Sequence, residues 1–216
     1  MLNFSGRQWE LRLDAPAGEA GRAEYANAWL FSVLGLMAAG AESGDRVAVL
    51  LPNCRETVLA YLACFKGNFV MVPLDYRHRA TQIGYALVHS GASVLIVHHD
   101  RVAELAAEGA LAGIPTVLVV GGDATDRRHR RFDDVASRST PGSLPESFED
   151  QDLCIMIFTS GTTSRPKGVT LTRGAVQSGI TKYLARVPLG PKDNALIAAP
   201  ITRPMALRCQ LLPSWA

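Results

Sequence analysis

Short apolar runs alternate with helical stretches along the first 120 residues, and this alternation is the strongest constraint on the fold. A nearly continuous apolar run is typical of a strand that is buried on both faces of a parallel sheet. Strands that alternate with helices form βαβ units. We therefore expect an α/β fold with a mostly parallel sheet and flanking helices. The predicted strands of this part are 46–51, 69–74, 94–97 and 116–120.

Apolar residues at helical spacing predict the connecting helices. Asn53 is expected to cap one of them, because Glu56 three residues later completes a capping-box-like arrangement. Asp100 is expected to cap another, and Gly91 to end a third. The predicted helices of this part are 25–39, 53–67, 81–90 and one that starts at Asp100.

Residues 121–151 differ from the rest because they are rich in Gly, Asp, Arg, Ser and Pro and lack periodicity. We expect a long surface loop or linker there. It separates an N-terminal α/β subdomain, 1–120, from the start of a second, truncated subdomain, 152–216. The second part is expected to contain strands over 153–158, 169–171 and 195–199, and a helix capped by Thr172.

The composition excludes several classes of function. The 216 residues are 48% hydrophobic and 19% charged, which is typical of a globular protein rather than of a disordered chain. The formal net charge is only +2, whereas nucleic-acid binders usually carry a concentrated basic excess. The basic run 127–131 has aspartates on both sides and is expected to be a solvated loop. We expect no nucleic-acid partner.

The cysteines give no sign of a disulfide framework or a zinc motif, because no C-x-x-C occurs. We expect reduced thiols in a cytoplasmic protein. The N-terminus lacks the basic region and apolar core of a signal peptide. The longest apolar stretch, 26–41, contains Asn27 and Ser32 and falls short of the ~20 residues that span a bilayer. A buried helix is expected there, and no transmembrane segment.

His98, His99 and Asp100 are potential metal ligands that follow a predicted strand. Adjacent residues of a strand point to opposite faces, and no second group of ligands lies at a suitable spacing. We therefore expect polar residues at a strand end, and no metal ligands.

The segment from Phe158 to Val169 carries the strongest functional signal. Its sequence is Phe-Thr-Ser-Gly-Thr-Thr-Ser-Arg-Pro-Lys-Gly-Val, and it lies between two predicted strands. Small residues let backbone N–H groups approach an anion closely, and hydroxyl groups add donors. Lys167 supplies a mobile positive charge for a phosphate. Such a loop is suited to wrapping a polyphosphate.

This loop is not a Walker A motif, in which Lys follows Gly and precedes Ser or Thr. Here Lys167 follows Pro166 and precedes Gly168. No G-x-S-x-G elbow is present, so that signature does not mark Ser160 as a nucleophile. Composition alone does not distinguish a phosphate-binding loop from an ordinary Ser/Thr-rich turn.

The order of the residues resembles the phosphate-binding signature of the adenylate-forming superfamily, which includes acyl-CoA synthetases, luciferases and nonribosomal adenylation domains. The usual form is aromatic-Thr-Ser-Gly-Ser/Thr-Thr-Gly-x-Pro-Lys-Gly-Val, and eleven of its twelve positions fit. Segments 44–53, 63–75 and 199–201 resemble further parts of the same family in the expected order. The similarity is closest to fatty-acyl or aryl-CoA synthetases.

The resemblance implies the N-terminal portion of the synthetase fold and a two-step reaction. A fatty or aryl carboxylic acid attacks the α-phosphate of ATP bound to Mg²⁺, which gives acyl-AMP and pyrophosphate. A thiol, usually coenzyme A, then takes the acyl group. Because both reactants of the first step are anionic, positioned cations are needed. The resemblance assigns phosphate binding, and no chemical step, to Thr159, Ser160, Gly161, Thr162, Thr163, Ser164, Lys167 and Gly168.

Several positions depart from the family pattern. Ser164 stands where glycine is usual, which costs about 1 kcal/mol if that position needs a positive φ. Arg173 and Arg203 stand where histidine is common, and Thr202 replaces an aromatic residue. Two interpretations of the two arginines stay open: solvated surface residues, or residues with a functional role.

Enzymes of this family are more than twice as long as the chain. Their later parts carry an adenine-binding Tyr-Gly-x-Thr-Glu segment, a ribose-binding aspartate and a C-terminal domain with the catalytic lysine, and the sequence contains none of these. We expect a truncated N-terminal part of an acyl-CoA synthetase that cannot adenylate alone. The alternatives are a non-catalytic module that binds nucleotide or a partner, and one half of a split synthetase completed by a separate C-terminal half.

The end of the chain is apolar, with 14 apolar residues among the last 23. Without a partner surface, this segment predicts an exposed apolar patch.

Overall fold

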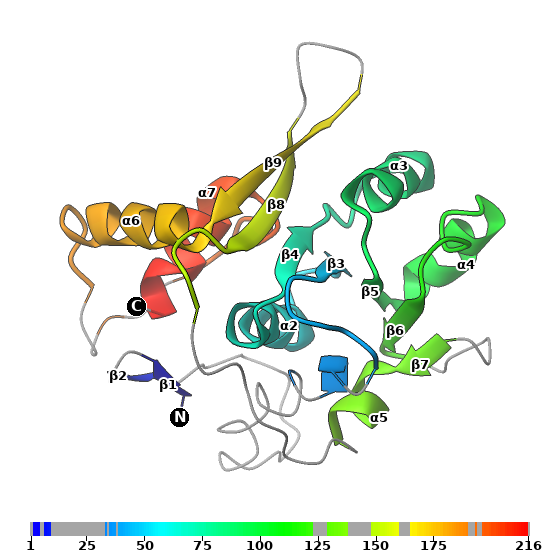
Figure 1. Ribbon diagram of the computed structural model, residues 1–216, viewed down its shortest axis with the longest axis horizontal. Helices are drawn as coiled ribbons and strands as arrows, with labels where there is room; N and C mark the ends of the chain where they lie inside the picture. The colour runs from blue at the N-terminus through cyan, green and yellow to red at the C-terminus, as the bar shows by residue number, and fades with distance from the viewer. Residues whose placement is uncertain are drawn as a thin grey trace.

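A seven-stranded sheet forms the centre of the computed structural model (Figure 1), in the order β7-β6-β5-β3-β4-β8-β9. All neighbouring strands are parallel except β8 and β9, which pair antiparallel. The predicted α/β fold with a mostly parallel sheet is confirmed. The structure describes residues 2–4, 7–9, 33, 35–37, 39–122, 129–137, 148–159, 165–189, 193 and 196–215.

Six strands of the large sheet lie close to their predicted positions, and β7 was not predicted. The strands of this sheet are β3 (Arg46–Leu50), β4 (Val70–Pro73), β5 (Val94–His98), β6 (Thr116–Val120), β7 (His129–Arg131), β8 (Leu153–Thr159) and β9 (Lys167–Thr172). A separate antiparallel pair consists of β1 (Leu2–Phe4) and β2 (Arg7–Trp9).

Strand β3 lies between β4 and β5 and separates two hydrophobic cores. Val47 and Val49 point into the core that contains α2 (Arg55–Gly67). Ala48 and Leu50 point into the core that contains α3 (Ala80–Ser90) and α4 (His99–Ala107). Because successive side chains of a strand alternate between faces, both faces of β3 are apolar. Figure 1 shows helices on both sides of the sheet.

The start of α2 differs from the prediction. Cys54, not Asn53, is the N-cap residue, and it makes no side-chain cap. The Asn53 side chain instead donates to the carbonyl of Ala199 at 3.0 Å and accepts from the N–H of Ile201 at 2.9 Å. A side-chain amide both donates and accepts hydrogen bonds. It therefore matches an extended backbone, which presents a C=O and an N–H, better than a helix N-terminus, which presents N–H groups alone. Asn53 therefore ties the C-terminal segment to the sheet.

Helix α3 ends at Gly91 as predicted, with φ 63° at that glycine. Helix α4 begins at His99, and its N-cap is His98, two residues before the expected cap Asp100. Strand alternation therefore stops at His98, and the side chains of His98, His99 and Asp100 lie together. The premise that these neighbours point to opposite faces is wrong.

The stretch 121–151 contains regular structure that the sequence analysis missed. Strand β7 and helix α5 (Phe132–Ser137) lie within it, and Phe132 and Val135 are buried in the core of α2. Strand β7 reads His-Arg-Arg and is an edge strand, so it shows no apolar pattern. Residues 123–128 and 138–147 lie outside the described part, and the division into two subdomains stays a prediction.

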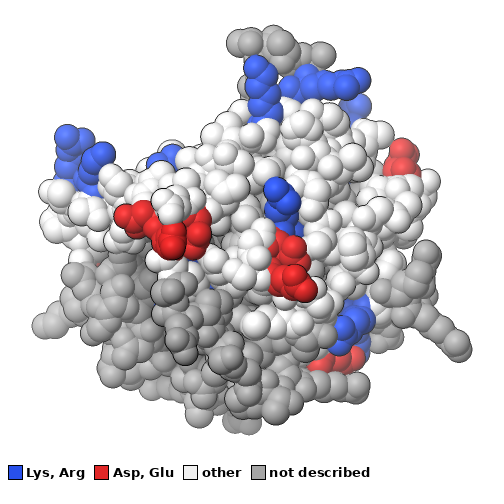
Figure 2. Space-filling model, viewed as in Figure 1, with Lys and Arg blue, Asp and Glu red and all other residues white. Residues whose placement is uncertain are grey.

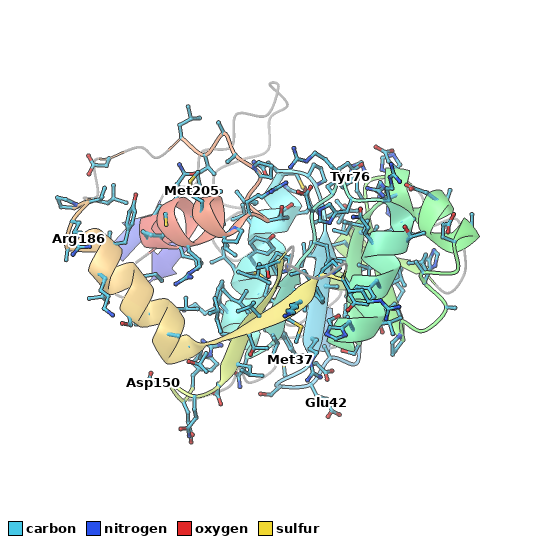
Figure 3. The ribbon with its side chains drawn as sticks, turned by 90° about the horizontal axis from the view of Figure 1, so that it is seen from above. Met37, Glu42, Tyr76, Asp150, Arg186 and Met205 are labelled. Carbon is cyan, nitrogen blue, oxygen red and sulfur yellow. The ribbon has the colours of Figure 1, made fainter. Side chains whose placement is uncertain are left out.

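The C-terminal segment folds back onto α6 (Arg173–Leu184) instead of forming the predicted strand. Residues 196–199 carry no strand in the structure. A continuous helical stretch follows them and runs beside α6 in Figure 3. Its apolar side chains Leu207 and Leu211 are buried, whereas Met205 is 63% exposed. It consists of α7 (Pro204–Ala206), a π-helical turn (η1, Leu207–Leu211) and a 3₁₀ turn (η2, Pro213–Trp215). Leu196 is 88% exposed as well, so the predicted apolar patch is covered in part.

Other predictions fall partly outside the described residues. Of the helix expected over 25–39, residues 33 and 35–37 are helical, and most of the remainder is not described. None of the helices in the described ranges combines the length and the apolar character needed to cross a bilayer. The four cysteines are free, as expected.

Helix α6 is capped by Thr172 as predicted, because the Thr172 hydroxyl accepts from the N–H of Ala175 at 3.3 Å. The first residue of the helix, Arg173, donates to the carbonyl of Phe65 at 2.6 Å and to Oδ1 of Asn68 at 3.2 Å. Its guanidinium also lies 3.9 Å from the ring centre of Phe148. Arg173 therefore clamps the C-terminal end of α2 and is not a solvated surface residue.

Removing this clamp should destabilise the fold. We expect Arg173→Ala to lower the free energy of unfolding by about 2 kcal/mol, because hydrogen bonds from a charged group to half-buried partners are lost. Urea unfolding measures this difference. Arg186→Ala, an exposed arginine just after the same helix, is the control and should change the value by less than about 0.5 kcal/mol. Equal effects of the two substitutions would contradict the clamp.

Asn53→Asp separates the two roles considered for Asn53. An aspartate caps a helix as well as an asparagine does, so the helix-cap hypothesis predicts no loss of stability. The observed contacts predict a loss of about 1–2 kcal/mol, because the donor to the Ala199 carbonyl is replaced by a carboxylate oxygen. Urea unfolding of the two proteins at neutral pH distinguishes these outcomes.

Candidate functional site

The predicted phosphate loop joins β8 to β9, and the structure brings its two ends together. Thr159 is the last residue of β8, Lys167 is the first residue of β9, and the two are direct partners in the antiparallel register. Both side chains are exposed. Five predicted site residues between them lie outside the described residues: Ser160, Gly161, Thr162, Thr163 and Ser164.

Gly168 contributes packing at the base of the loop. It pairs with Phe158 across the hairpin, and a Cβ atom at Gly168 would lie 3.3 Å from the sulfur of Met156. A larger residue would push against this side chain, so glycine lets the two strands lie close. Gly168 is therefore placed to shape the hairpin, at the position next to Lys167.

Positive charge gathers near this end of the hairpin. Arg165 and Lys167 are both exposed, and neither forms an ion pair with another described residue. Figure 2 shows Lys and Arg side chains at the top of the molecule, where β8 and β9 end in the same view of Figure 1. A cationic, exposed loop end can attract and hold an anion.

Helix α3 supports both ends of the loop, a feature that the sequence analysis missed. The Tyr85 hydroxyl donates to the carbonyl of Pro166 at 3.2 Å. The Tyr85 ring stacks on His89 with ring centres 5.4 Å apart, and His89 meets the ring of Phe158 edge-on at 6.0 Å. Phe158 precedes the loop and Pro166 ends it. The only signal in the sequence was the i, i+4 spacing of Tyr85 and His89.

A second group of polar contacts lies where segment 199–203 crosses the carboxyl ends of β3 and β4. Besides the Asn53 contacts, Arg203 forms an ion pair of 2.9 Å with Asp75, which follows β4. Arg77 pairs with the same carboxylate at 3.0 Å. The hydrogen bond from Arg77 is the main reason why the pKa of Asp75 is held well below its usual range. Asp75 therefore stays ionised and fixes Arg203, which is 56% exposed.

A half-open pocket of about 340 Å³ lies between α6 and the C-terminal helical stretch. Its lining includes Val176, Ile180, Tyr183 and Leu212, with Arg208 as the charged member. Gly179 makes room for this arginine, since a Cβ atom there would lie 3.2 Å from a terminal guanidinium nitrogen of Arg208.

The chain matches the family described as AMP-binding enzyme over residues 34–215. It is 37% identical over 183 residues to feruloyl-CoA synthase of an Amycolatopsis species, covering 83% of this chain and 34% of that protein. It is 31% identical over 174 residues to the long-chain-fatty-acid–CoA ligase FadD13 of Mycobacterium tuberculosis, covering 80% of this chain and 33% of the relative. The chain thus spans about a third of the length of these curated relatives.

Solved structures show the same fold. The N-terminal domain of FACL13 from Mycobacterium tuberculosis superposes with a TM-score of 0.77 at 24% identity, covering 90% of this chain and 47% of that one. ATP-bound MatB from Rhodopseudomonas palustris superposes with a TM-score of 0.72 at 25% identity, covering 84% of this chain and 35% of that one. On its sequence, its sheet and its β8–β9 hairpin together, this chain belongs to the AMP-binding enzyme family.

Proposed function

We propose that this chain is the nucleotide-binding N-terminal part of an ATP-dependent acid–thiol ligase. In this reaction a carboxylic acid and ATP give acyl-AMP and pyrophosphate, and the acyl group then passes to coenzyme A. The observation that carries the proposal is the β8–β9 hairpin, which sets Thr159 opposite Lys167 at the ends of the family's phosphate loop. We propose that the chain has no adenylating activity of its own.

The role proposed for the loop is electrostatic. The leaving pyrophosphate gains negative charge as the carboxylate attacks the α-phosphate, so a cation held near the β- and γ-phosphates stabilises the transition state. The exposed ammonium of Lys167 is suited to this role. Mg²⁺ bound to ATP prefers oxygen ligands, and the hydroxyl of Thr159, on the strand opposite Lys167, offers a neutral one.

The acid is proposed to bind beside α6. The segment that begins at Ala199 resembles the start of the family's carboxylate-pocket helix, and the half-open pocket lies between that helical stretch and α6. Ferulate and long-chain fatty acids, named for the relatives, both join an apolar body to a carboxylate. The pocket offers apolar side chains to such a body and the Arg208 guanidinium to such a carboxylate. A cytoplasmic location also belongs to this proposal.

Nucleotide binding can be tested on the chain itself. We expect Mg²⁺-ATP to raise the melting temperature, with a stabilisation of about 1.4 kcal/mol at ten times the Kd. Lys167→Ala should abolish this shift, because it removes the cation at the loop end. Differential scanning fluorimetry measures both. Lys182→Ala, an exposed lysine on α6, should keep the shift. The absence of any shift at millimolar ATP in the unmodified chain would count against the proposal.

The contact between Tyr85 and the loop gives a second test. Tyr85→Phe removes the hydrogen bond to the Pro166 carbonyl but keeps the aromatic stack on His89. We expect ATP affinity to fall about three- to tenfold, and amide exchange at Lys167 and Gly168 to speed up, because one hydrogen bond holding the loop is lost. Calorimetry and hydrogen exchange measure these changes. Tyr61→Phe, which removes a buried hydroxyl on α2, should leave both unchanged.

A further inference from the structure

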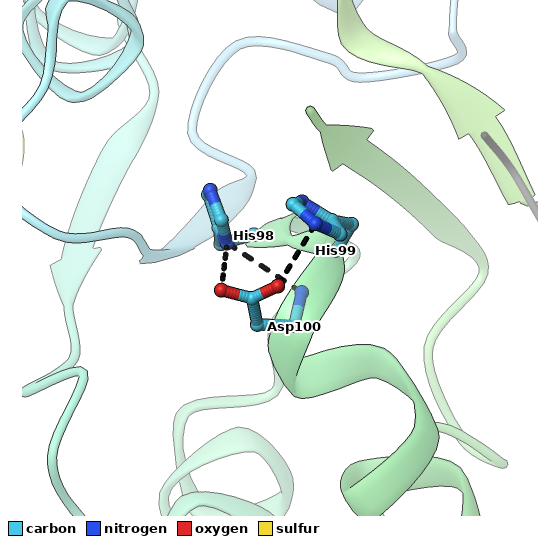
Figure 4. Close-up of side chains that lie close together, drawn as sticks. All are labelled: His98, His99 and Asp100. Atoms are coloured by element: carbon cyan, nitrogen blue, oxygen red, sulfur yellow. Dashed lines mark hydrogen bonds and ion pairs between the residues drawn. The ribbon is translucent and has the colours of Figure 1, made fainter. Parts of the chain in front are cut away.

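Three consecutive side chains form a cluster at the carboxyl end of β5. Figure 4 shows His98, His99 and Asp100 with their polar groups turned toward one another. Asp100 bridges the two imidazoles: its carboxylate lies 3.3 Å from Nδ1 of His98 and 2.8 Å from Nε2 of His99. One ligand atom from each residue lies within 4.8 Å of the others. The bend from strand to helix at His98 creates this grouping.

His98 contacts Asp100 through one ring nitrogen. Its Nδ1 lies 3.3 Å from an oxygen of the Asp100 carboxylate and 3.5 Å from the backbone nitrogen of the same residue. An imidazole nitrogen and a carboxylate oxygen at this distance can share a proton, and a metal ion bound by both groups would take the place of that proton.

The spacing suits a metal ion. In a tetrahedral zinc site with bonds of about 2.0–2.2 Å, neighbouring ligand atoms lie about 3.4 Å apart. The side chains of His99 and Asp100 are 44% and 58% exposed, so they can rotate inward, and water can reach the remaining coordination positions. His98 is only 22% exposed and provides the fixed ligand.

Neighbouring residues hold the cluster in place. Gly121 and Gly122, which follow β6, have φ of 69° and 60° and pack against the His99 ring. A Cβ atom at Gly121 would lie 2.8 Å from Nδ1 of His99. On the other side, the Tyr76 ring meets His98 edge-on at 6.0 Å. Such surrounding contacts orient ligand side chains in metal sites.

The place in the sheet also favours a ligand site. The chain passes from β3 to β4 in one direction and then returns to place β5 on the other side of β3. In open α/β sheets, ligands bind outside the carboxyl ends of the strands where this reversal occurs. His98 is the last residue of β5 and stands at that point.

We propose that His98, His99 and Asp100 bind one divalent first-row transition metal ion, such as Zn²⁺ or Co²⁺. Two imidazoles and one carboxylate form a donor set that suits these ions better than it suits Mg²⁺ or Ca²⁺, which prefer oxygen ligands. Three protein ligands leave at least one position for water. The site is separate from the phosphate loop and does not depend on the proposed nucleotide binding.

Titration of the purified chain with Co²⁺, without nucleotide, tests this site. We expect one equivalent to bind, with a visible absorption band from nitrogen and oxygen ligands and no near-ultraviolet band from cobalt bound to a thiolate. His99→Gln should weaken binding at least about tenfold because one ligand is lost. His98→Asn should do the same while keeping a residue that caps α4. Calorimetry with Zn²⁺ provides the affinities.

Two further variants complete the test. His78→Gln removes an exposed histidine outside the cluster and should leave the affinity unchanged. Asp100→Asn keeps the size of the side chain, removes the anionic ligand and should weaken binding at least about tenfold. No binding at millimolar metal would overturn the proposal, as would binding that His98→Asn and His99→Gln leave intact. Neither result bears on ATP binding, which is measured separately.

Discussion

Burial of β3 on both faces is the constraint on which the rest of the structure depends. Its side chains alternate between a core shared with α2 and a core shared with α3 and α4. An apolar strand of this kind is stable only between two layers of helices. The layers in turn hold β4 and β5 beside it in parallel register, so that the carboxyl ends of these strands meet at one edge of the sheet. Asn53 and Asp75 follow the ends of β3 and β4, and His98 is the last residue of β5.

Long-range polar contacts then fasten the second half of the chain to that frame. The Asn53 amide binds the backbone of Ala199 and Ile201, and Asp75 binds Arg203. Arg173 joins the start of α6 to the end of α2. These contacts place the start of the C-terminal helical stretch at the edge of the sheet where the carboxyl ends of β3 and β4 lie. The half-open pocket lies between this stretch and α6. Both arginines that depart from the family pattern thus have a structural partner.

Helix α3 connects the core to the candidate site. Ile83 and Leu87 anchor the helix in the core, whereas Tyr85 and His89 contact the residues on either side of the phosphate loop. Fixing the two ends of a loop lowers the free-energy cost of ordering it around a ligand. The apolar pattern of α3 indicated only its buried face, because the contacts of Tyr85 and His89 with the hairpin depend on the tertiary structure.

The sequence by itself determined six of the seven strands of the large sheet, the helices α2, α3, α4 and α6, the family and the position of the β8–β9 motif, because apolar periodicity and a contiguous motif are local properties of the chain. Local signals misassigned the caps at Asn53 and Asp100, a strand over 195–199 and the grouping at His98. They also missed β7 and α5, whose core residues among the described side chains are Phe132 and Val135. Only the tertiary structure decided these features, because each depends on a partner far along the chain or on a bend between two elements: an asparagine that could cap a helix binds a backbone 146 residues away instead.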